Sequence, residues 1–286
     1  MEKLISDQQF DEERALYGIS NTQVKNCRID GPLDGESAFK ECENIVVEDC
    51  YFNLRYPFWH VNKAVLKNNE MTENCRAALW YDQHISAENC QMHGIKAFRE
   101  CSDIKIKSCD MVSPEIFWRC NQVNIQSSKL QSEYPFFECK DVEIDRLQMK
   151  GKYSFQYVEN MTITNSDLDT KDAFWHSRNV TVIDSVVRGE YLGWYSENLK
   201  FVRCKIIGTQ PLCYCKGLVL EDCTMEGTDL SFERSEVNAT VIGAIKSVKN
   251  PLRGNIQADE IGELVMEEQF VISRDTLIQA NIVKTI

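Results

Sequence analysis

A repeat of 19 residues constrains the fold of this 286-residue chain more than any other feature. Four consecutive segments align residue for residue: SDIKIKSCDMVSPEIFWRC (102–120), NQVNIQSSKLQSEYPFFEC (121–139), KDVEIDRLQMKGKYSFQYV (140–158) and ENMTITNSDLDTKDAFWHS (159–177). The grid runs from Ser20 to Arg234 as eleven segments, and nine of them have 19 residues. Segments 20–42 and 62–82 carry four and two extra residues, which we place just before the aromatic stretch. Such a period indicates repeats that stack on one another.

The pattern inside each repeat is typical of strands. Apolar residues at positions 3 and 5 alternate with polar neighbours, as at Ile104 and Ile106, and position 10 is apolar as well. Position 2 holds residues that accept a left-handed turn, such as Asn21 and Asp103. Three short strands fill 19 residues and leave no room for a crossover helix. We therefore predict an all-β fold, a right-handed single-stranded parallel β-helix (solenoid) of about 11–13 coils of about 19 residues.

The prediction treats residues 1–286 as a single β-helix domain. Residues 1–19 form an N-terminal cap, in which SDQQFDEERAL is predicted to be a short helix over the open core. Residues 20–234 form the regular coils, and residues 235–286 form irregular coils and a C-terminal cap. Caps are expected because a terminal coil presents unpaired strand edges.

Several runs of the sequence resemble those of an uncharacterised, mainly bacterial family of unknown function. The runs are DGESAFKEC, RYPFWH, RAALWYD, GKYSFQYV, TKDAFWH, GEYLGWYSENL and GTQPLCYC. The resemblance spans nearly the whole chain and implies the fold group of the pectate-lyase-like β-helices. It implies no activity and carries no catalytic residue with it.

Charge and composition limit the partners. The formal net charge of -12 argues against nucleic acid, because phosphate binding needs clustered Lys and Arg. The sequence contains neither a signal-peptide pattern at its N-terminus nor eighteen consecutive apolar residues, which predicts a cytoplasmic protein without a membrane partner. No phosphate-binding, dinucleotide-binding or zinc-protease motif is present, so we predict neither cofactor nor metal.

Eleven of the thirteen cysteines fall in two columns of the grid. Position 8 holds Cys27, Cys50, Cys90, Cys109, Cys204 and Cys223, and position 19 holds Cys42, Cys101, Cys120, Cys139 and Cys215. One column supplies a line of thiols rather than the tetrahedral ligand set of a zinc site. We expect free thiols that serve as small core hydrophobes.

Two adjacent columns are aromatic, and a strand cannot bury both. Position 16 holds Phe58, Phe98, Phe117, Phe136, Phe155 and Phe174, and position 17 holds Trp59, Trp80, Arg99, Trp118, Phe137, Gln156, Trp175 and Trp194. Arg99 and Gln156 would be costly in a core. The phenylalanine column is therefore predicted to be inside, and position 17 is predicted to face water.

Position 18 is polar and reads His60, Tyr81, Glu100, Arg119, Glu138, Tyr157, His176, Tyr195 and Tyr214. At the coil spacing the two histidines would stand roughly 29 Å apart, too far to share one catalytic event. Glu100 and Glu138 would be about 9.6 Å apart at the backbone, at the upper edge of the carboxylate separation in inverting glycosidases. Arg119 between them could keep both ionised or hold an anionic group.

Three interpretations of this surface remain open: a structural ladder of alternating charges, a ligand site, and a catalytic site. We predict a carbohydrate-binding or carbohydrate-processing β-helix; the alternative is a non-enzymatic interaction module that self-associates, for instance as a homodimer. An enzyme of this kind would be a glycoside hydrolase or resemble a polysaccharide lyase, with Glu100, Glu138 and Arg119 as catalytic residues. The predicted ligand-binding residues are Trp59, Trp80, Tyr81, Trp118, Phe137, Tyr157, Trp175, His60 and His176.

Overall fold

The computed structural model describes residues 3–30, 36–267 and 275–286. Within these residues the chain is an all-β parallel solenoid without helices, and its turns, about 14 in number, are spaced by about 19 residues. The predicted fold class is therefore confirmed. The chain divides into two compact units, Met1–Gln148 (unit 1) and Met149–Ile286 (unit 2), and each is described by itself.

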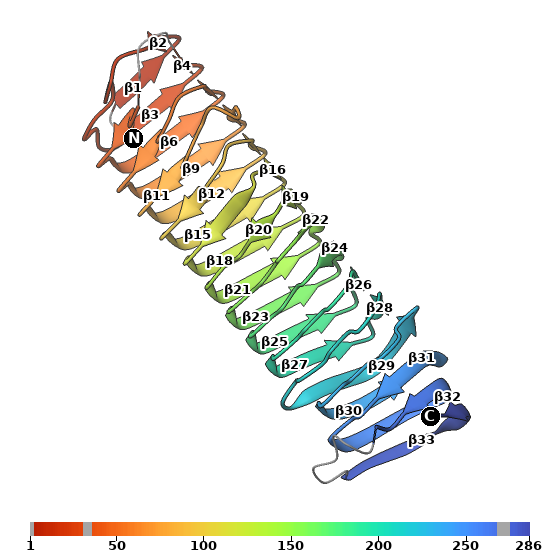
Figure 1. The fold of residues 1–286 in the computed structure, drawn as a ribbon. Helices are drawn as coiled ribbons and strands as arrows, with labels where there is room; N and C mark the ends of the chain where they lie inside the picture. The colour runs from red at the N-terminus through yellow and green to blue at the C-terminus, as the bar shows by residue number, and fades with distance from the viewer. Residues whose placement is uncertain (1–2, 31–35, 268–274) are drawn as a thin grey trace. The chain divides into compact units, whose positions relative to one another are not determined.

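Unit 1 contains three parallel sheets, and its first sheet is shown in Figure 1 with its strands side by side in chain order. This sheet A comprises β1 (Lys3–Ser6), β3 (Thr22–Lys25), β6 (Glu43–Glu48), β9 (Asn62–Lys67), β12 (Gln83–Glu88), β15 (Ser102–Lys107), β18 (Asn121–Gln126) and β21 (Lys140–Asp145). Sheet B comprises β2 (Gln9–Phe10), β4 (Arg28–Ile29), β7 (Tyr51–Phe52), β10 (Glu70–Met71), β13 (Gln91–Met92), β16 (Asp110–Val112) and β19 (Lys129–Ser132). Sheet C comprises β5 (Phe39–Lys40), β8 (Phe58–Trp59), β11 (Leu79–Trp80), β14 (Ala97–Arg99), β17 (Glu115–Trp118) and β20 (Tyr134–Pro135).

The strand register follows the sequence grid. Ile104 pairs with Val123 and Ile106 with Ile125, each one repeat further along the chain. Met71 still pairs with Phe52 at the 19-residue spacing, whereas Leu79 pairs with Phe58 at 21. The two extra residues of this coil therefore lie between Met71 and Leu79, before the aromatic stretch, as predicted.

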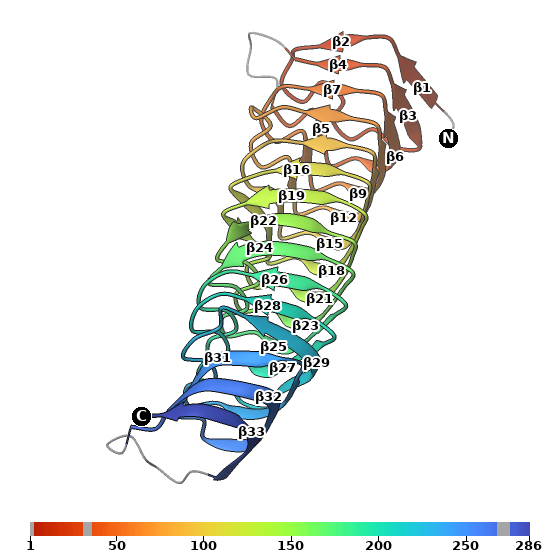
Figure 2. The ribbon, with the colours of Figure 1, turned by 90° about the vertical axis from the view of Figure 1, so that its right-hand side faces the viewer.

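Unit 2 continues the same architecture in its own strands, which the second view also shows (Figure 2). One sheet comprises β23 (Glu159–Thr164), β25 (Arg178–Ile183), β27 (Glu197–Val202), β29 (Leu218–Glu226), β30 (Glu236–Val241), β31 (Ala244–Lys249), β32 (Arg253–Val265) and β33 (Asp275–Thr285). A second comprises β22 (Gln148–Lys152), which begins at the division, β24 (Asp167–Lys171), β26 (Val186–Arg188) and β28 (Lys205–Ile207), which pairs with the end of β29. Where unit 1 has sheet C, coils of unit 2 have turns.

The short helix predicted near the N-terminus is wrong. Residues 3–10 instead form β1 and β2, which pair in parallel with β3 and β4. Parallel pairing satisfies the backbone groups along the edges of β3 and β4, which a helix laid over the core would leave open. In the described part of the chain no helix is long and apolar enough to cross a membrane.

The phenylalanine column fills the core, as predicted. Phe98, Phe117 and Phe136 are fully buried, and consecutive rings stack with centroids 4.8 Å apart. Phe155 and Phe174 repeat the arrangement in unit 2 at 5.0 Å. Rings stacked in this way exclude water from the corner where each coil turns.

The cysteine columns do more than the predicted hydrophobic packing. All thirteen cysteines are free and buried, but several of the thiols are hydrogen-bonded. The backbone N–H of Cys90 donates to Cys109 Sγ at 3.4 Å, and the N–H of Cys109 donates to Ser128 Oγ at 3.1 Å. In return, Cys109 Sγ donates to the Ala87 carbonyl. Positions 8 and 19 therefore hold small side chains that satisfy backbone groups at the corners, which explains why Ser can replace Cys.

Candidate binding surfaces

The side chains at position 17, here called the indole column, are half-buried against the loops that precede sheet C or its equivalent turns. Trp118 Nε1 donates to the Tyr134 carbonyl at 2.8 Å, and Trp175 and Trp194 do the same to Tyr191 and Gln210. Gln156 Nε2 donates to the Asp172 carbonyl at 3.3 Å. Each bond spans 16 residues, so these four side chains fasten position 14 of the next coil. This shared bond explains why Gln can stand among tryptophans. Trp59 Nε1 and Trp80 Nε1 are buried without a hydrogen-bond partner among the described residues.

The flat ring faces of the indole column are turned towards neighbouring coils. Trp59 and Trp80 stack on each other with centroids 5.8 Å apart, and Lys40 Nζ lies 4.4 Å from the Trp59 ring. The guanidinium of Arg99 lies 5.2 Å from the Trp118 ring, and Phe137 lies 5.1 Å from it. These faces of the predicted ligand-binding rings thus have protein partners.

The side chains at position 18, here called the outer column, occupy a strained backbone conformation. His60, Tyr81, Glu100, Arg119 and Glu138 all have φ between 53° and 58°. This left-handed region is uncommon for residues other than Gly, Asn and Asp.

Positions 2 and 7 have the same conformation but mostly use the residues that favour it. Asn21, Asn44 and Asp103 stand at position 2, and Asn68 and Asn89 at position 7. The outer column instead places rings and long charged side chains on this backbone. Phe98 and Phe117 at position 16 share this conformation but are buried in the core, whereas most of the outer column is exposed.

Glu100, Arg119 and Glu138 form the vertical file that the repeat predicts. Arg119 Nε donates to Glu138 Oε2 at 2.8 Å, and its Nη1 donates to Glu100 Oε1 at 3.2 Å. The hydrogen bonds that Arg119 donates to Glu138 and Glu100 raise the pKa of Arg119 above its ordinary value. All three side chains remain partly exposed, at 29%, 49% and 43% for Glu100, Arg119 and Glu138. Both carboxylates are thus held by one guanidinium.

The file continues towards the N-terminus of unit 1. His60 stacks on Tyr81 at 5.0 Å with an interplanar angle of 8°. Beyond His60, Glu41 also has a left-handed backbone and accepts a 2.5 Å hydrogen bond from the hydroxyl of Tyr17. Glu41 was missed although the grid includes it, because Cys42 stands at position 19 of the first segment and the residue before it therefore stands at position 18.

Three predicted ligand-binding residues, Tyr157, Trp175 and His176, belong to unit 2. There His176 stacks between Tyr157 and Tyr195 at 5.0 and 5.1 Å, and Tyr195 stacks on Tyr214 at 4.8 Å. Tyr157 and Tyr195 are exposed to 47% and 45%. Trp175 and Trp194 stack behind them at 5.5 Å. Unit 2 therefore carries an outer column of rings with no carboxylate between them. The predicted separation of the two histidines stays a prediction, since His60 and His176 lie in different units.

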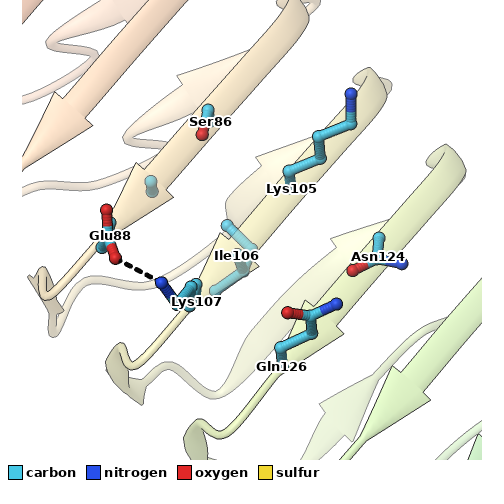
Figure 3. Close-up of a pocket in the computed structure, with 8 residues that line it drawn as sticks. Ser86, Glu88, Lys105, Ile106, Lys107, Asn124 and Gln126 are labelled. Carbon is cyan, nitrogen blue, oxygen red and sulfur yellow. Dashed lines mark hydrogen bonds and ion pairs between the residues drawn. The ribbon is translucent and has the colours of Figure 1, made fainter.

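A second surface in unit 1 is a shallow open hollow of about 320 Å³ on the outer face of sheet A (Figure 3). Its lining comprises Ser86, Ala87, Glu88, Lys105, Ile106, Lys107, Asn124 and Gln126. Lys107 Nζ pairs with Glu88 Oε1 at 2.7 Å, and Lys105 Nζ lies 3.7 Å from Asp103. These charges are matched by their neighbours, as on an ordinary solvated sheet. No group of three or more His, Cys, Asp or Glu side chains in the described residues is arranged to hold a metal ion.

Fold and surface together define a parallel β-solenoid with an outward file of stacked rings and paired charges. The chain belongs to the family DUF3737, described as a protein of unknown function, whose model matches residues 3–279. No curated protein matches its sequence.

Solved structures of similar fold include PfbA, a surface adhesin of Streptococcus pneumoniae, at 11% identity and a TM-score of 0.35, covering 88% of this chain and 72% of PfbA. A mutant tailspike protein of E. coli bacteriophage HK620, in complex with a pentasaccharide, has 9% identity and a TM-score of 0.30, with 98% and 70% covered. The A-module of a mannuronan C-5 epimerase of Azotobacter vinelandii has 8% identity and a TM-score of 0.29, with 99% and 87% covered.

Proposed function

We propose that the protein binds an extended, hydroxyl-rich ligand, an oligosaccharide, along the outer column of unit 1. The observation that carries the proposal is the choice of His60, Tyr81, Glu100, Arg119 and Glu138 for a left-handed corner that favours Asn or Gly. Each coil presents one exposed hydrogen-bonding side chain in the same direction. A ligand that repeats along its own length can meet such a file with one contact per coil.

The chemistry of the file suits hydroxyl donors. Glu100 and Glu138 each use one carboxylate oxygen for Arg119, so each has a second oxygen for a ligand hydroxyl. The Tyr81 ring is 41% exposed and brings both a hydroxyl and an apolar edge to the surface. Carbohydrates combine hydroxyls with apolar C–H groups, so these neighbours supply matching partners. Binding rather than cleavage is the proposed activity, because both carboxylates are committed to one guanidinium.

A glycan array with the full chain, followed by titration calorimetry on any hit, tests the proposal. Tyr81→Ala, Glu100→Gln and Glu138→Gln are expected to weaken binding by about tenfold each, the effect of losing one hydrogen bond to a charged or ring partner. Asn68→Ala at position 7 is the matched control, because this residue has the same backbone conformation but lies outside the outer column. Trp118→Ala is unsuitable as a test, because it would also free the loop that Trp118 holds.

Binding that survives all three outer-column substitutions would place the ligand elsewhere, and a wild-type chain that binds no glycan would overturn the proposal. Turnover of a bound glycan that Glu100→Gln and Glu138→Gln abolish would assign hydrolysis instead of binding alone.

A further inference from the structure

The last strand of unit 2 has an open edge. Within the described residues β33 pairs with β32 alone, in parallel, from Arg253↔Asp275 to Leu264↔Thr285. Along its other edge, backbone N–H and C=O groups are without a strand partner. Such an edge is a template for another strand, and natural proteins usually shorten it, charge it or cover it.

Apart from a register irregularity against β32 between Gln257 and Glu260, β33 carries few of the features that protect an edge. It has eleven residues, contains no proline and has a single lysine, Lys284, which pairs with Glu263 of β32. Its large apolar side chains are exposed: Leu277 to 58%, Ile282 to 38% and Val283 to 63%. An unpaired backbone edge and exposed aliphatic side chains therefore coincide on one strand.

The sequence of β33 is nearly a palindrome about Ala280. Reading outward from Ala280, Gln279 corresponds to Asn281 and Ile278 to Ile282. One step further, Leu277 corresponds to Val283. Two antiparallel copies centred on Ala280 would set amide opposite amide and aliphatic opposite aliphatic. Residues opposite each other in an antiparallel pair share a face of the sheet, so each of these pairs would be in contact.

We propose that β33 is a self-association edge, at which a second copy of this chain adds its own β33 in antiparallel orientation about a two-fold axis through Ala280. A two-fold contact of this kind uses one patch on both copies and closes as a dimer. Pairing satisfies the open backbone groups of both strands and covers Leu277 and Val283 of both copies. The contact lies at the end of unit 2 and does not involve the outer column, so it is independent of the proposed ligand site.

Charge exchange across the two-fold tests the register as well as the contact. Leu277→Lys alone sets two lysines against valines, and Val283→Glu alone sets two glutamates against leucines, so each single variant is expected to weaken the dimer about tenfold or more. In the double variant L277K/V283E each lysine lies opposite a glutamate of the other copy, which gives two such pairs per dimer. The dissociation constant is therefore expected to return towards that of the wild type. Sedimentation equilibrium of the full chain measures the dissociation constants.

Ile242→Lys is the matched control, because Ile242 is also 58% exposed but lies outside β33. The dissociation constant of this variant's dimer is expected to equal that of the wild type. Urea midpoints of all variants show whether each remains folded. A monomeric wild type, unaffected dimers in both single variants, or a double variant no better than the singles would each overturn the proposal. Open-ended polymers would also overturn it, since they require a head-to-tail contact.

Discussion

Asp82 is the most informative position for testing how the corners of the coils work. It is fully buried in the column where other coils use Cys, Ser or Val. Its Oδ1 accepts the Val61 N–H at 2.8 Å, but its buried Oδ2 has no hydrogen-bond partner among the described residues. Burial raises the pKa of Asp82 well above its ordinary value.

At another corner of the same chain, both polar atoms of a buried side chain have hydrogen-bond partners. Asn69, in the other corner column, accepts the Cys50 N–H with Oδ1 and donates from Nδ2 to the Val47 carbonyl, both at 2.9 Å. Val47 stands three residues before Cys50, and Phe58 stands three residues before Val61. In Asp82→Asn the new amide is therefore expected to donate to the Phe58 carbonyl, as Asn69 does to Val47.

We expect Asp82→Asn to stabilise the protein at pH 7 by about 1–3 kcal/mol, the penalty of one buried group without a partner. The sign follows from the raised pKa. Below the unfolded-state pKa both states hold the proton, and the carboxyl imposes no charge penalty. As pH rises above that value the unfolded state loses its proton first, so wild-type stability falls by about 1.4 kcal/mol per pH unit until the folded state also ionises.

Urea unfolding of wild type and Asp82→Asn between pH 4 and pH 8 measures this difference, and other carboxylates cancel in the comparison. Asn69→Asp is the converse control and is expected to lose stability as pH rises. A stability difference that does not change with pH, or an Asp82→Asn variant less stable at pH 7, would refute this account of the corner.

Three further predictions follow from the columns. Cys109→Ser keeps the acceptor for the Cys90 N–H and is expected to be about 1–3 kcal/mol more stable than Cys109→Val, by urea unfolding. Gln156→Ala removes the bond to the Asp172 carbonyl and is expected to speed hydrogen exchange in that loop, whereas Gln156→Trp should leave exchange slow. Phe117→Ala, in the middle of the buried stack, is expected to cost about 3–5 kcal/mol. Equal stability of Cys109→Ser and Cys109→Val would contradict the first assignment, and equal hydrogen exchange in Gln156→Ala and Gln156→Trp would contradict the second. A loss of stability below about 1 kcal/mol for Phe117→Ala would contradict the third.

The sequence predicts most of this fold because one short rule repeats along the chain. Apolar residues recur at positions 3, 5, 10 and 16 in many coils. Because the same positions are apolar each time, the repeat identifies them as core. The N-terminal segment was assigned wrongly because the grid was begun at Ser20. The 19-residue spacing continues before it, since Ile5 pairs with Val24 and Phe10 with Ile29.

The surface was less predictable, because exposure of a column does not say which part of each ring is exposed. Position 17 was predicted to face water, but Trp118 is half-buried, and its N–H bond to the Tyr134 carbonyl depends on how the next coil folds. The file of Glu100, Arg119 and Glu138 was predictable because it needs only the coil register. Sequence distance fixes which side chains are neighbours along the axis; it does not fix how a ring is turned between them.

Strain together with exposure distinguishes the outer column, because Phe98 and Phe117 share its left-handed backbone but are fully buried in the core. A column selected only to complete a corner could use Asn on every coil, as position 2 does at Asn160, Asn179 and Asn198 through a ladder of side-chain hydrogen bonds. At position 18 of unit 1 the chain instead places Glu100 and Arg119 on the same backbone conformation, which costs of order 1 kcal/mol or more for each such residue. Each exposed ion pair with Arg119 stabilises the folded state by only about 0–1 kcal/mol. Packing alone therefore does not explain the choice of these residues, and the ligand that we propose would account for it by contacting their free edges.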